Sequence, residues 1–267
     1  ACSRRFENAA ALSPQFYACM LGFRKMGGDV VDHLHFGSGE QVRILGAGAV
    51  REALARCAED FCASGGALSL QVDTSGGILA RIARGQTYDL IAAASDALED
   101  LAQKGVLEGE PLVLGAARLA MGVRKGAAAP DISSIAAYKE ALLGARCFVR
   151  GDPKGGGTGG RLIEDGLARI GVLEITLPRT LLRVGGHNVM AAVADGSADF
   201  GITQSTEIGP APGVEIGGFL PEGVQVETIY SIAAQKGASI GAQAMLAYLA
   251  SAAGRKRFAD AGFFAAG

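Results

Sequence analysis

The sequence predicts an α/β fold in which a largely parallel sheet is covered by helices. From Gln41 onward, short apolar segments alternate with turns of small residues and with segments of helical periodicity. The same order recurs beyond residue 118. Repeated strand–turn–helix units are typical of parallel sheets. A chain of 267 residues is long enough for two lobes or for one large domain.

The first part of the chain contains three such units. Each strand is a short apolar run, and Leu54, Ala58 and Phe61 share one face of the first helix. We expect strands at 42–45, 68–72 and 89–93, and helices at 51–64, 78–84 and 97–104.

The second part continues the alternation with longer connections. Residues 209–223 are rich in glycine and proline, which predicts a loop. Around it we expect strands at 118–123, 145–149, 181–184, 200–203 and 226–233, and helices at 135–143, 162–170, 189–194, 241–252 and 255–261.

Residues 1–40 do not share this pattern. Their one apolar patch is interrupted by Ser13, Pro14 and Gln15, which makes a poor secretory signal core. We expect an N-terminal extension that is disordered, or sequence upstream of a start at Met26. His33 and His35 resemble a metal pair, but no cluster of further ligands accompanies them, so we expect no metal there.

The composition argues against several classes of protein. A net charge of −2 without a basic stripe does not suit a general nucleic-acid binder. No apolar run reaches the roughly 18–20 residues of a membrane span, so no membrane insertion is expected. The five cysteines are odd in number and form no CxxC pair, which predicts free thiols and slightly favours a reducing compartment.

Five turns at expected strand ends consist of small or hydroxyl residues and open the next helix. They read "GAGAV", "DTSGG", "GDPKGGGTGGR", "GGHN" and "TQSTE". Ligands of open α/β sheets bind at the carboxyl ends of strands, where helix N-termini offer N–H groups and a positive dipole end. The set therefore indicates an anion site. For any single turn, close packing of a helix on a strand is the competing interpretation.

The glycine loop at 151–161 does not fit the known nucleotide motifs. A Walker A loop requires lysine after its second glycine, whereas Gly157 follows Gly156 here. The GxGxxG match at Gly155 lacks the acidic residue expected about 20 residues later, so no dinucleotide is predicted. A backbone cradle for an anion remains, with Thr158 as a hydroxyl donor. Lys154 and Arg161 either add charge to it or are solvated at its edge.

Long segments of the chain resemble the periplasmic molybdate-binding proteins. The segments read "ILGAGAVREAL", "DTSGGILARIARGQTYDLIAAASDALEDLAQKGVL", "LLGARCFVRGDPKGGGTGG", "GGHNVMAAVADGSADFGITQSTEI" and "MLAYLASAAGRKRFADAGF", and together they cover about residues 41–264. The resemblance implies a two-lobed, type II periplasmic-binding-protein fold, with a cleft between the lobes and two hinge crossovers, near 118–124 and 227–232. It places lobe I at 41–118 plus 228–267, and lobe II at 119–227.

The chain departs from this family at two implied ligand positions. Ala49 stands where the family has a serine, and Gln204 where it has a tyrosine, whereas Ser75 and Val189 are retained. These changes imply an anion of another shape. The glycine-rich loop with Thr158 resembles that of relatives that bind citrate-like carboxylates, and one such branch is aconitate isomerase.

The first functional hypothesis is a solute-binding protein that captures a small oxyanion or carboxylate, without cofactor or metal. The resemblance implies an ABC-transporter permease as partner and a periplasmic location; cytoplasmic retention is the alternative, because no signal is seen. Directional hydrogen bonds to a charged acceptor suit such a receptor. Its expected ligand-binding residues are Ala47, Gly48, Ala49, Thr74, Ser75, Gly76, Gly156, Gly157, Thr158, Gly159, Asn188, Val189, Gln204 and Ser205.

The second hypothesis is an isomerase that moves a proton on a tricarboxylate. Such chemistry needs a base whose pKa lies near the working pH. His187 is the first candidate, and Glu207 and Asp73 are the others, although all three also suit structural roles in turns or helix caps. A cytosolic sensor built on the same fold is a third hypothesis.

Overall fold

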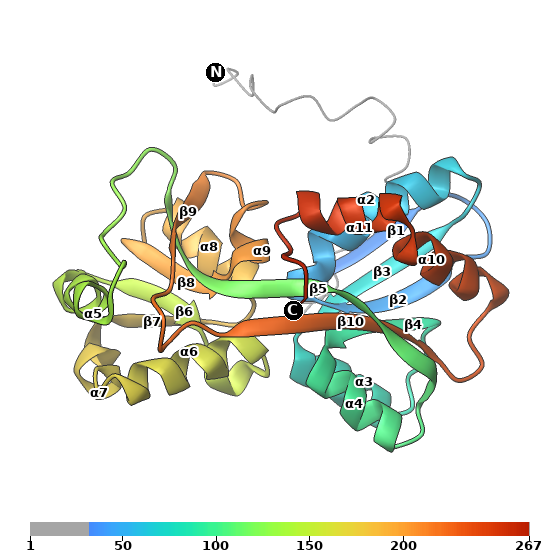
Figure 1. The fold of residues 1–267 in the computed structure, drawn as a ribbon, viewed down its shortest axis with the longest axis horizontal. Helices are drawn as coiled ribbons and strands as arrows, with labels where there is room; N and C mark the ends of the chain where they lie inside the picture. The colour runs from blue at the N-terminus through green and yellow to red at the C-terminus, as the bar shows by residue number, and fades with distance from the viewer. Residues whose placement is uncertain (1–31, 267) are drawn as a thin grey trace, which may run out of the picture.

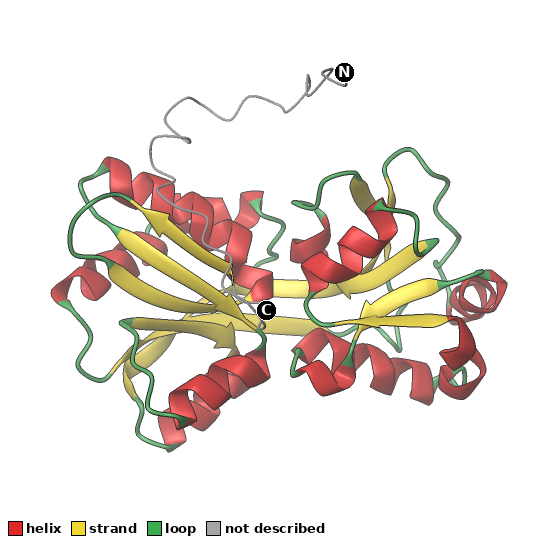
Figure 2. Ribbon diagram, turned by 180° about the vertical axis from the view of Figure 1, so that it is seen from behind, coloured by secondary structure: helices red, strands yellow, loops and turns green. Residues whose placement is uncertain are grey.

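The computed structural model describes residues 32–266, which form a two-lobed α/β protein (Figure 1). The strands follow the order β1-β3-β2-β4-β10-β5-β8-β6-β7, and β9 also pairs with β5. Helices lie on both sides of the strands in each lobe (Figure 2). The α/β class predicted from the sequence is therefore confirmed.

The first lobe is built around parallel strands that are flanked by antiparallel ones. Its strands are β1 (Asp32–Phe36), β2 (Val42–Ala47), β3 (Leu68–Asp73) and β4 (Leu90–Ala94), and its helices are α2 (Arg51–Ala63), α3 (Ser75–Ala83), α4 (Ser95–Gln103), α10 (Ile240–Ala250) and α11 (Ala252–Asp260). The strands β2 and β4 are parallel neighbours, and their side chains are almost fully buried. Parallel strands covered on both faces require such apolar runs.

The second lobe repeats the arrangement. Its strands are β6 (Phe148–Gly151), β7 (Thr180–Arg183), β8 (Phe200–Gln204) and β9 (Val214–Phe219), and its helices are α5 (Ile135–Gly144), α6 (Thr158–Arg169), α7 (Leu173–Thr176), α8 (Gly186–Ala194) and α9 (Ser205–Ile208). Phe148 and Phe200 stack with their ring centroids 5.6 Å apart in its core. Both lobes therefore have an apolar core of their own.

Two strands pass between the lobes, β5 (Leu107–Arg124) and β10 (Glu227–Gln235). They pair antiparallel from Arg118 and Glu227 to Leu107 and Gln235 (Figure 1). Arg118 Nε lies 2.9 Å from the Glu227 carboxylate where the pairing ends. The chain's last described segment reaches the same region, because Phe264 pairs with Ala116 and lies under the Arg118 guanidinium. Any change in the angle between the lobes must therefore bend β5 and β10.

Two strands lie where the sequence predicted none. Residues 32–36 fall in the expected extension, yet β1 pairs antiparallel with β3. Its alternation explains this, because Leu34 and Phe36 are buried whereas His33 is exposed. The expected loop at 209–223 contains β9, which pairs with β5. The other interpretations of residues 1–31 lie outside the described residues.

Three cysteines fall within residues 32–266, and all are free thiols, as predicted: Cys57, Cys62 and Cys147. Burial raises the pKa of Cys57 to about 12, so this thiol is not reactive. Over the same residues, no helix is both long and apolar enough to cross a membrane.

Candidate functional site

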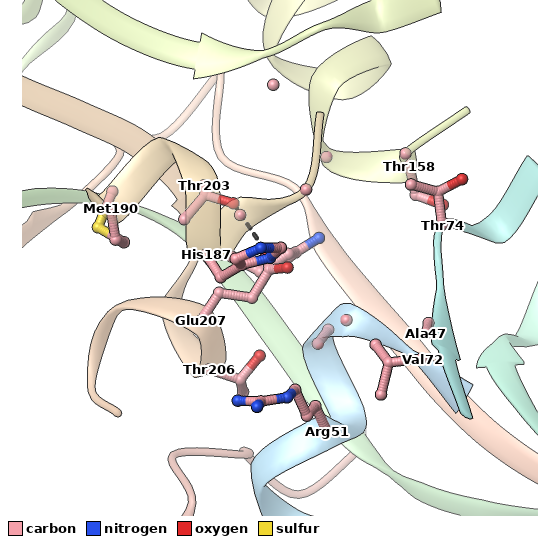
Figure 3. A pocket seen from close by; sticks show the side chains of 18 of the residues that line it. Ala47, Arg51, Val72, Thr74, Thr158, His187, Met190, Thr203, Thr206 and Glu207 are labelled. Carbon is pink, nitrogen blue, oxygen red and sulfur yellow. Dashed lines mark hydrogen bonds between the residues drawn. The ribbon is translucent and has the colours of Figure 1, made fainter. Parts of the chain in front are cut away.

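A cavity of about 330 Å³ lies between the two lobes, and it is lined by the turns that follow their strands (Figure 3). The first lobe contributes the ends of β2 and β3. The second lobe contributes the glycine loop, the start of α8, and the end of β8 with α9. The expected convergence of strand ends is therefore present, and the cavity has the volume of a small-molecule site.

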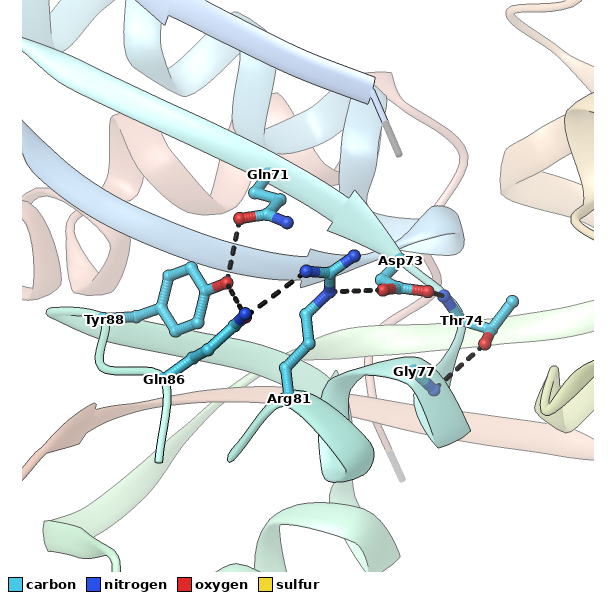
Figure 4. A network of polar contacts seen from close by, with 7 residues as sticks. All are labelled: Gln71, Asp73, Thr74, Gly77, Arg81, Gln86 and Tyr88. Carbon is cyan, nitrogen blue, oxygen red and sulfur yellow. Dashed lines mark hydrogen bonds and ion pairs between the residues drawn. The ribbon is translucent and has the colours of Figure 1, made fainter. Parts of the chain in front are cut away.

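The β3–α3 turn is fixed by side chains that bond to the main chain. Thr74 is the N-cap of α3, and its hydroxyl accepts the Gly77 N–H at 3.1 Å. Asp73 accepts the Thr74 N–H at 2.7 Å and Arg81 Nε at 2.6 Å (Figure 4). Position 77 requires glycine, because a Cβ there would lie 2.0 Å from the Asp73 carboxylate.

This network supports the structural interpretation of Asp73. Its carboxylate bonds to Arg81 and to the turn, and Arg81 also bonds to Gln86, which Tyr88 contacts (Figure 4). These contacts hold the turn in shape.

The glycines of the loop at 151–161 serve three different purposes. Gly151 and Gly160 let α6 approach β6, because a Cβ on Gly151 would lie 2.9 Å from the Gly160 Cα. Gly156 has a φ of 75°, which a side chain rarely tolerates. Gly157 and Gly159 border the cavity. The close-packing interpretation thus holds for the first pair, and the cradle remains a proposal for the last.

The start of α6 contributes the hydroxyl of Thr158, but no charged side chain, to the cavity lining. Gly157 is the N-cap of α6, and no side chain caps the helix. Lys154 and Arg161 are exposed and are not part of the cavity lining, so the solvated interpretation holds for both. Any positive potential at this end therefore comes from the helix N-terminus itself.

The two lobes touch directly at this end of the cavity. The Gly76 N–H donates to the Gly156 carbonyl at 2.8 Å, and the hydroxyls of Ser75 and Thr158 are 2.9 Å apart. A Cβ on Gly76 would lie 3.0 Å from the Gly156 Cα. The structure is therefore a closed form, with main chain packed on main chain across the cleft.

The opposite end of the cavity is built around Glu207. Its carboxylate accepts the Thr203 hydroxyl at 2.6 Å and backbone N–H groups of Gly186 and Gln204. A Cβ on Gly186 would lie 2.1 Å from this carboxylate, and one on Gly48 of the other lobe would lie 2.8 Å from it. Two glycines from different lobes thus form a socket for Glu207. Burial raises the pKa of Glu207 above its ordinary value, against the effect of the three donors.

Comparison with known proteins agrees with this architecture. Residues 42–264 match the family described as bacterial extracellular solute-binding proteins. The chain belongs to that family. It is also 31% identical over 193 residues to an aconitate isomerase of a Pseudomonas species, which covers 71% of this chain and 72% of that protein.

Solved structures show that this solute-binding protein shares the fold of periplasmic molybdate-binding proteins. The periplasmic molybdate-binding protein of Azotobacter vinelandii superposes with a TM-score of 0.71 at 17% identity, over 85% of this chain and 100% of that one. The substrate-binding domain of a putative molybdenum ABC transporter from Clostridium difficile gives 0.64 at 18% identity, over 85% and 99%. At such identities the likeness shows the fold alone.

The structure brings most, but not all, of the expected ligand-binding residues of this solute-binding protein to one cavity. Those that line it are Ala47, Gly48, Ala49, Thr74, Ser75, Gly157, Thr158, Gly159 and Gln204, together with His187. Gly76 and Gly156 form the interlobe contact instead. Val189 is fully buried in the lobe core, and the Asn188 side chain donates to the Val184 carbonyl. The Ser205 hydroxyl accepts the Arg118 N–H.

Several other lining residues were not predicted from the sequence, namely Arg51, Val72, Met190, Thr203, Thr206 and Tyr230. Most lie beside the expected turns, so a wider window around each strand end would have found them. Glu207 was predicted only as an alternative base or as a cap. The socket that gives Glu207 its importance depends on two glycines that are remote in sequence.

The raised pKa of Glu207 predicts how the stability of this solute-binding protein changes with pH. A carboxyl whose pKa is higher in the folded state favours folding while protonated, and this contribution is lost as the pH rises from about 4 through the folded pKa. Glu207→Gln cannot ionise. We therefore expect the free energy of unfolding of wild type to fall relative to that of Glu207→Gln between about pH 4 and pH 8. Urea denaturation across this range measures the difference, and a difference independent of pH would contradict the prediction.

Proposed function

We propose that this protein captures a small organic carboxylate in the interlobe cavity. The observation that carries the proposal is the pairing of two helix N-termini from different lobes, those of α3 and α6, at one end of the interlobe cavity. The first N–H groups of a helix have no partner within it and attract negative charge. In α3, those of Gly76 and Gly77 already donate to the Gly156 carbonyl and the Thr74 hydroxyl, so the first N–H groups of α6 are the main donors. The hydroxyls of Thr74, Ser75 and Thr158 lie at the same end, within reach of a carboxylate placed there.

Two features favour a carboxylate over a tetrahedral oxyanion. Ala49 has no side-chain hydroxyl, so the turn after β2 can bind a ligand only through its backbone groups. The volume of about 330 Å³ exceeds what one tetrahedral oxyanion fills, and Val72 and Met190 line part of it with apolar atoms. A carbon skeleton would occupy this apolar part.

Membership of the solute-binding family supports a role in uptake. We propose that the protein works outside the cytoplasm and delivers its ligand to an ABC-type permease. Pull-down of a detergent-solubilised permease by the loaded protein, but not by the ligand-free protein, would support this step.

The ligand class is tested by a thermal-shift screen with isothermal titration calorimetry of any hits. The panel contains molybdate, tungstate, sulfate, phosphate, citrate, isocitrate and both aconitate isomers. A ligand at 100 times its Kd stabilises a protein by about 2.7 kcal/mol, which is readily detected. We expect carboxylates to raise the melting temperature. A rise with tetrahedral oxyanions alone would refute the carboxylate assignment.

A second candidate function is isomerisation of an unsaturated tricarboxylate. The identity of 31% to an aconitate isomerase favours it, as does the presence of His187 and Glu207, a histidine and a carboxyl of raised pKa, in the cavity lining. Proton transfer to and from carbon requires groups of this kind. Proton NMR of cis- and trans-aconitate mixed with protein tests it. Interconversion that is lost in His187→Ala would make the protein an enzyme, and no interconversion by wild type would leave it a receptor.

A further inference from the structure

The two ends of the cavity differ in chemistry. Figure 3 shows Thr74 and Thr158 on one side of the pocket and Glu207, His187 and Thr203 on the other. The first end offers helix N-termini and hydroxyls, which suit an anion. The second contains a carboxyl group of the protein itself, which would repel a second ionised group of the ligand.

Glu207 already occupies the donors that would otherwise bind an anion there. Its carboxylate takes the Gly186 N–H at the start of α8, the Gln204 N–H and the Thr203 hydroxyl. The socket formed by Gly48 and Gly186 fits this side chain closely from both lobes. A carboxylate has about four lone-pair sites, so Glu207 can still accept a hydrogen bond from a group in the cavity.

Two further side chains beside Glu207 have polar atoms without a hydrogen-bond partner among the described residues. Gln204 is 1% exposed, and its Oε1 has no partner, although its Nε2 donates to Thr228 at 3.0 Å. Thr206 is 3% exposed, and its Oγ1 also lacks a partner. Buried polar atoms in proteins are almost always hydrogen-bonded. Both residues line the cavity, so a bound ligand is the natural source of the missing bonds.

We propose that the ligand is a hydroxy-carboxylate, with its hydroxyl at the Glu207 end. This inference rests on the proposed capture of a carboxylate. Glu207 and Gln204 Oε1 accept hydrogen bonds, so the group between them must donate. An ammonium group would donate as well, and the cavity lining contains both Arg51 and acidic side chains, so the comparison of aspartate with malate decides between the two donors. A hydroxyl donates without adding charge.

Matched acids that differ only in the hydroxyl test the inference. Isothermal titration calorimetry would compare malate with succinate, and citrate with tricarballylate. A hydrogen bond to a charged group contributes about 1.5–3 kcal/mol, so we expect wild type to bind the hydroxy acid about 10- to 100-fold more tightly. In Glu207→Gln, whose amide donates as well as accepts, we expect this ratio to fall to about threefold or less. Glu174→Gln removes an exposed charge from α7, far from the cavity lining, and should keep the wild-type ratio.

The outcomes distinguish failure of the hydroxyl inference from failure of the proposed carboxylate capture. If none of the four acids binds wild type, both fail. If the acids bind without preference for the hydroxyl, or if Glu207→Gln keeps the wild-type ratio, only the hydroxyl inference fails. Tighter binding of aspartate than of malate would replace the hydroxyl with an ammonium group. Should Glu207→Gln not fold, Gln204→Met removes the second acceptor at similar volume, and the same loss of preference is expected.

Discussion

Gly76→Val is expected to weaken ligand binding about 10- to 100-fold while both lobes remain folded. Gly76 lies in the first turn of α3, where valine is compatible with the backbone. In the closed form, however, its Cβ would lie 3.0 Å from the Gly156 Cα, and that neighbour is main chain that cannot rotate away. The lobes must then separate, which also lengthens the bond from the Gly76 N–H to the Gly156 carbonyl. The energetic cost falls on the closed form alone.

Calorimetry with a ligand found in the thermal-shift screen would measure the loss of affinity, and small-angle scattering would report closure. We expect the ligand to reduce the radius of gyration of wild type but not of Gly76→Val. Gly144→Val is the matched control, because Gly144 ends α5 with nothing within 4 Å of its added Cβ. Wild-type affinity in Gly76→Val would mean that the interlobe contact is not required for capture.

Glu164→Ala is expected to destabilise the protein by about 2–3 kcal/mol. Arg150 is 1% exposed at the end of β6, and its Nη2 lies 2.7 Å from the Glu164 carboxylate. Without Glu164, the guanidinium keeps, among the described residues, only a 3.3 Å bond to the Gly151 carbonyl. An uncompensated buried charge is costly, but Glu164 is itself 35% exposed, which places the loss below the roughly 3–5 kcal/mol usual for a fully buried pair.

Urea denaturation would measure this loss against Asp165→Ala, which removes an exposed carboxylate from the next position of α6 and should change stability by less than about 0.5 kcal/mol. Adding Arg150→Met to Glu164→Ala removes the stranded charge at similar volume and should restore most of the stability. If Glu164→Ala were as stable as Asp165→Ala, the Arg150–Glu164 ion pair would contribute nothing to the stability of the fold.

Strands with strong apolar runs were predictable from the sequence, and those with mixed composition were not. The runs that form β2, β4 and β8 are bounded by turns of small residues, so their position follows from local pattern alone. In contrast, β9 contains Gly217, whose missing side chain makes room for Val123 of β5. The first half of β5 contains exposed glutamates. Pairing with partners distant in the chain stabilises both segments, and single-sequence patterns do not report such partners.

Residues of the candidate site were likewise predictable only where their signal in the sequence is local. Thr74, Ser75 and Thr158 were identified because each opens a helix after a strand, which is a local signal. The importance of Glu207 arises from Gly186 of its own lobe and from Gly48 of the other lobe, and Gly48 meets it only once the lobes have closed. Likewise, Gly76 and Gly156 were expected to bind a ligand, whereas they bind one another. Contacts between lobes depend on tertiary structure, and turn chemistry alone does not specify them.

The main-chain bond between Gly76 and Gly156 has a consequence for kinetics. Opening of the lobes at this end of the cavity requires that this bond and the Ser75–Thr158 hydroxyl pair break. The dissociation rate of a solute that leaves by this route contains the rate at which these contacts break. Weak and strong ligands should therefore differ less in residence time than their own contacts suggest, and a downstream acceptor that pries the two strand-end turns apart would speed release without touching the solute.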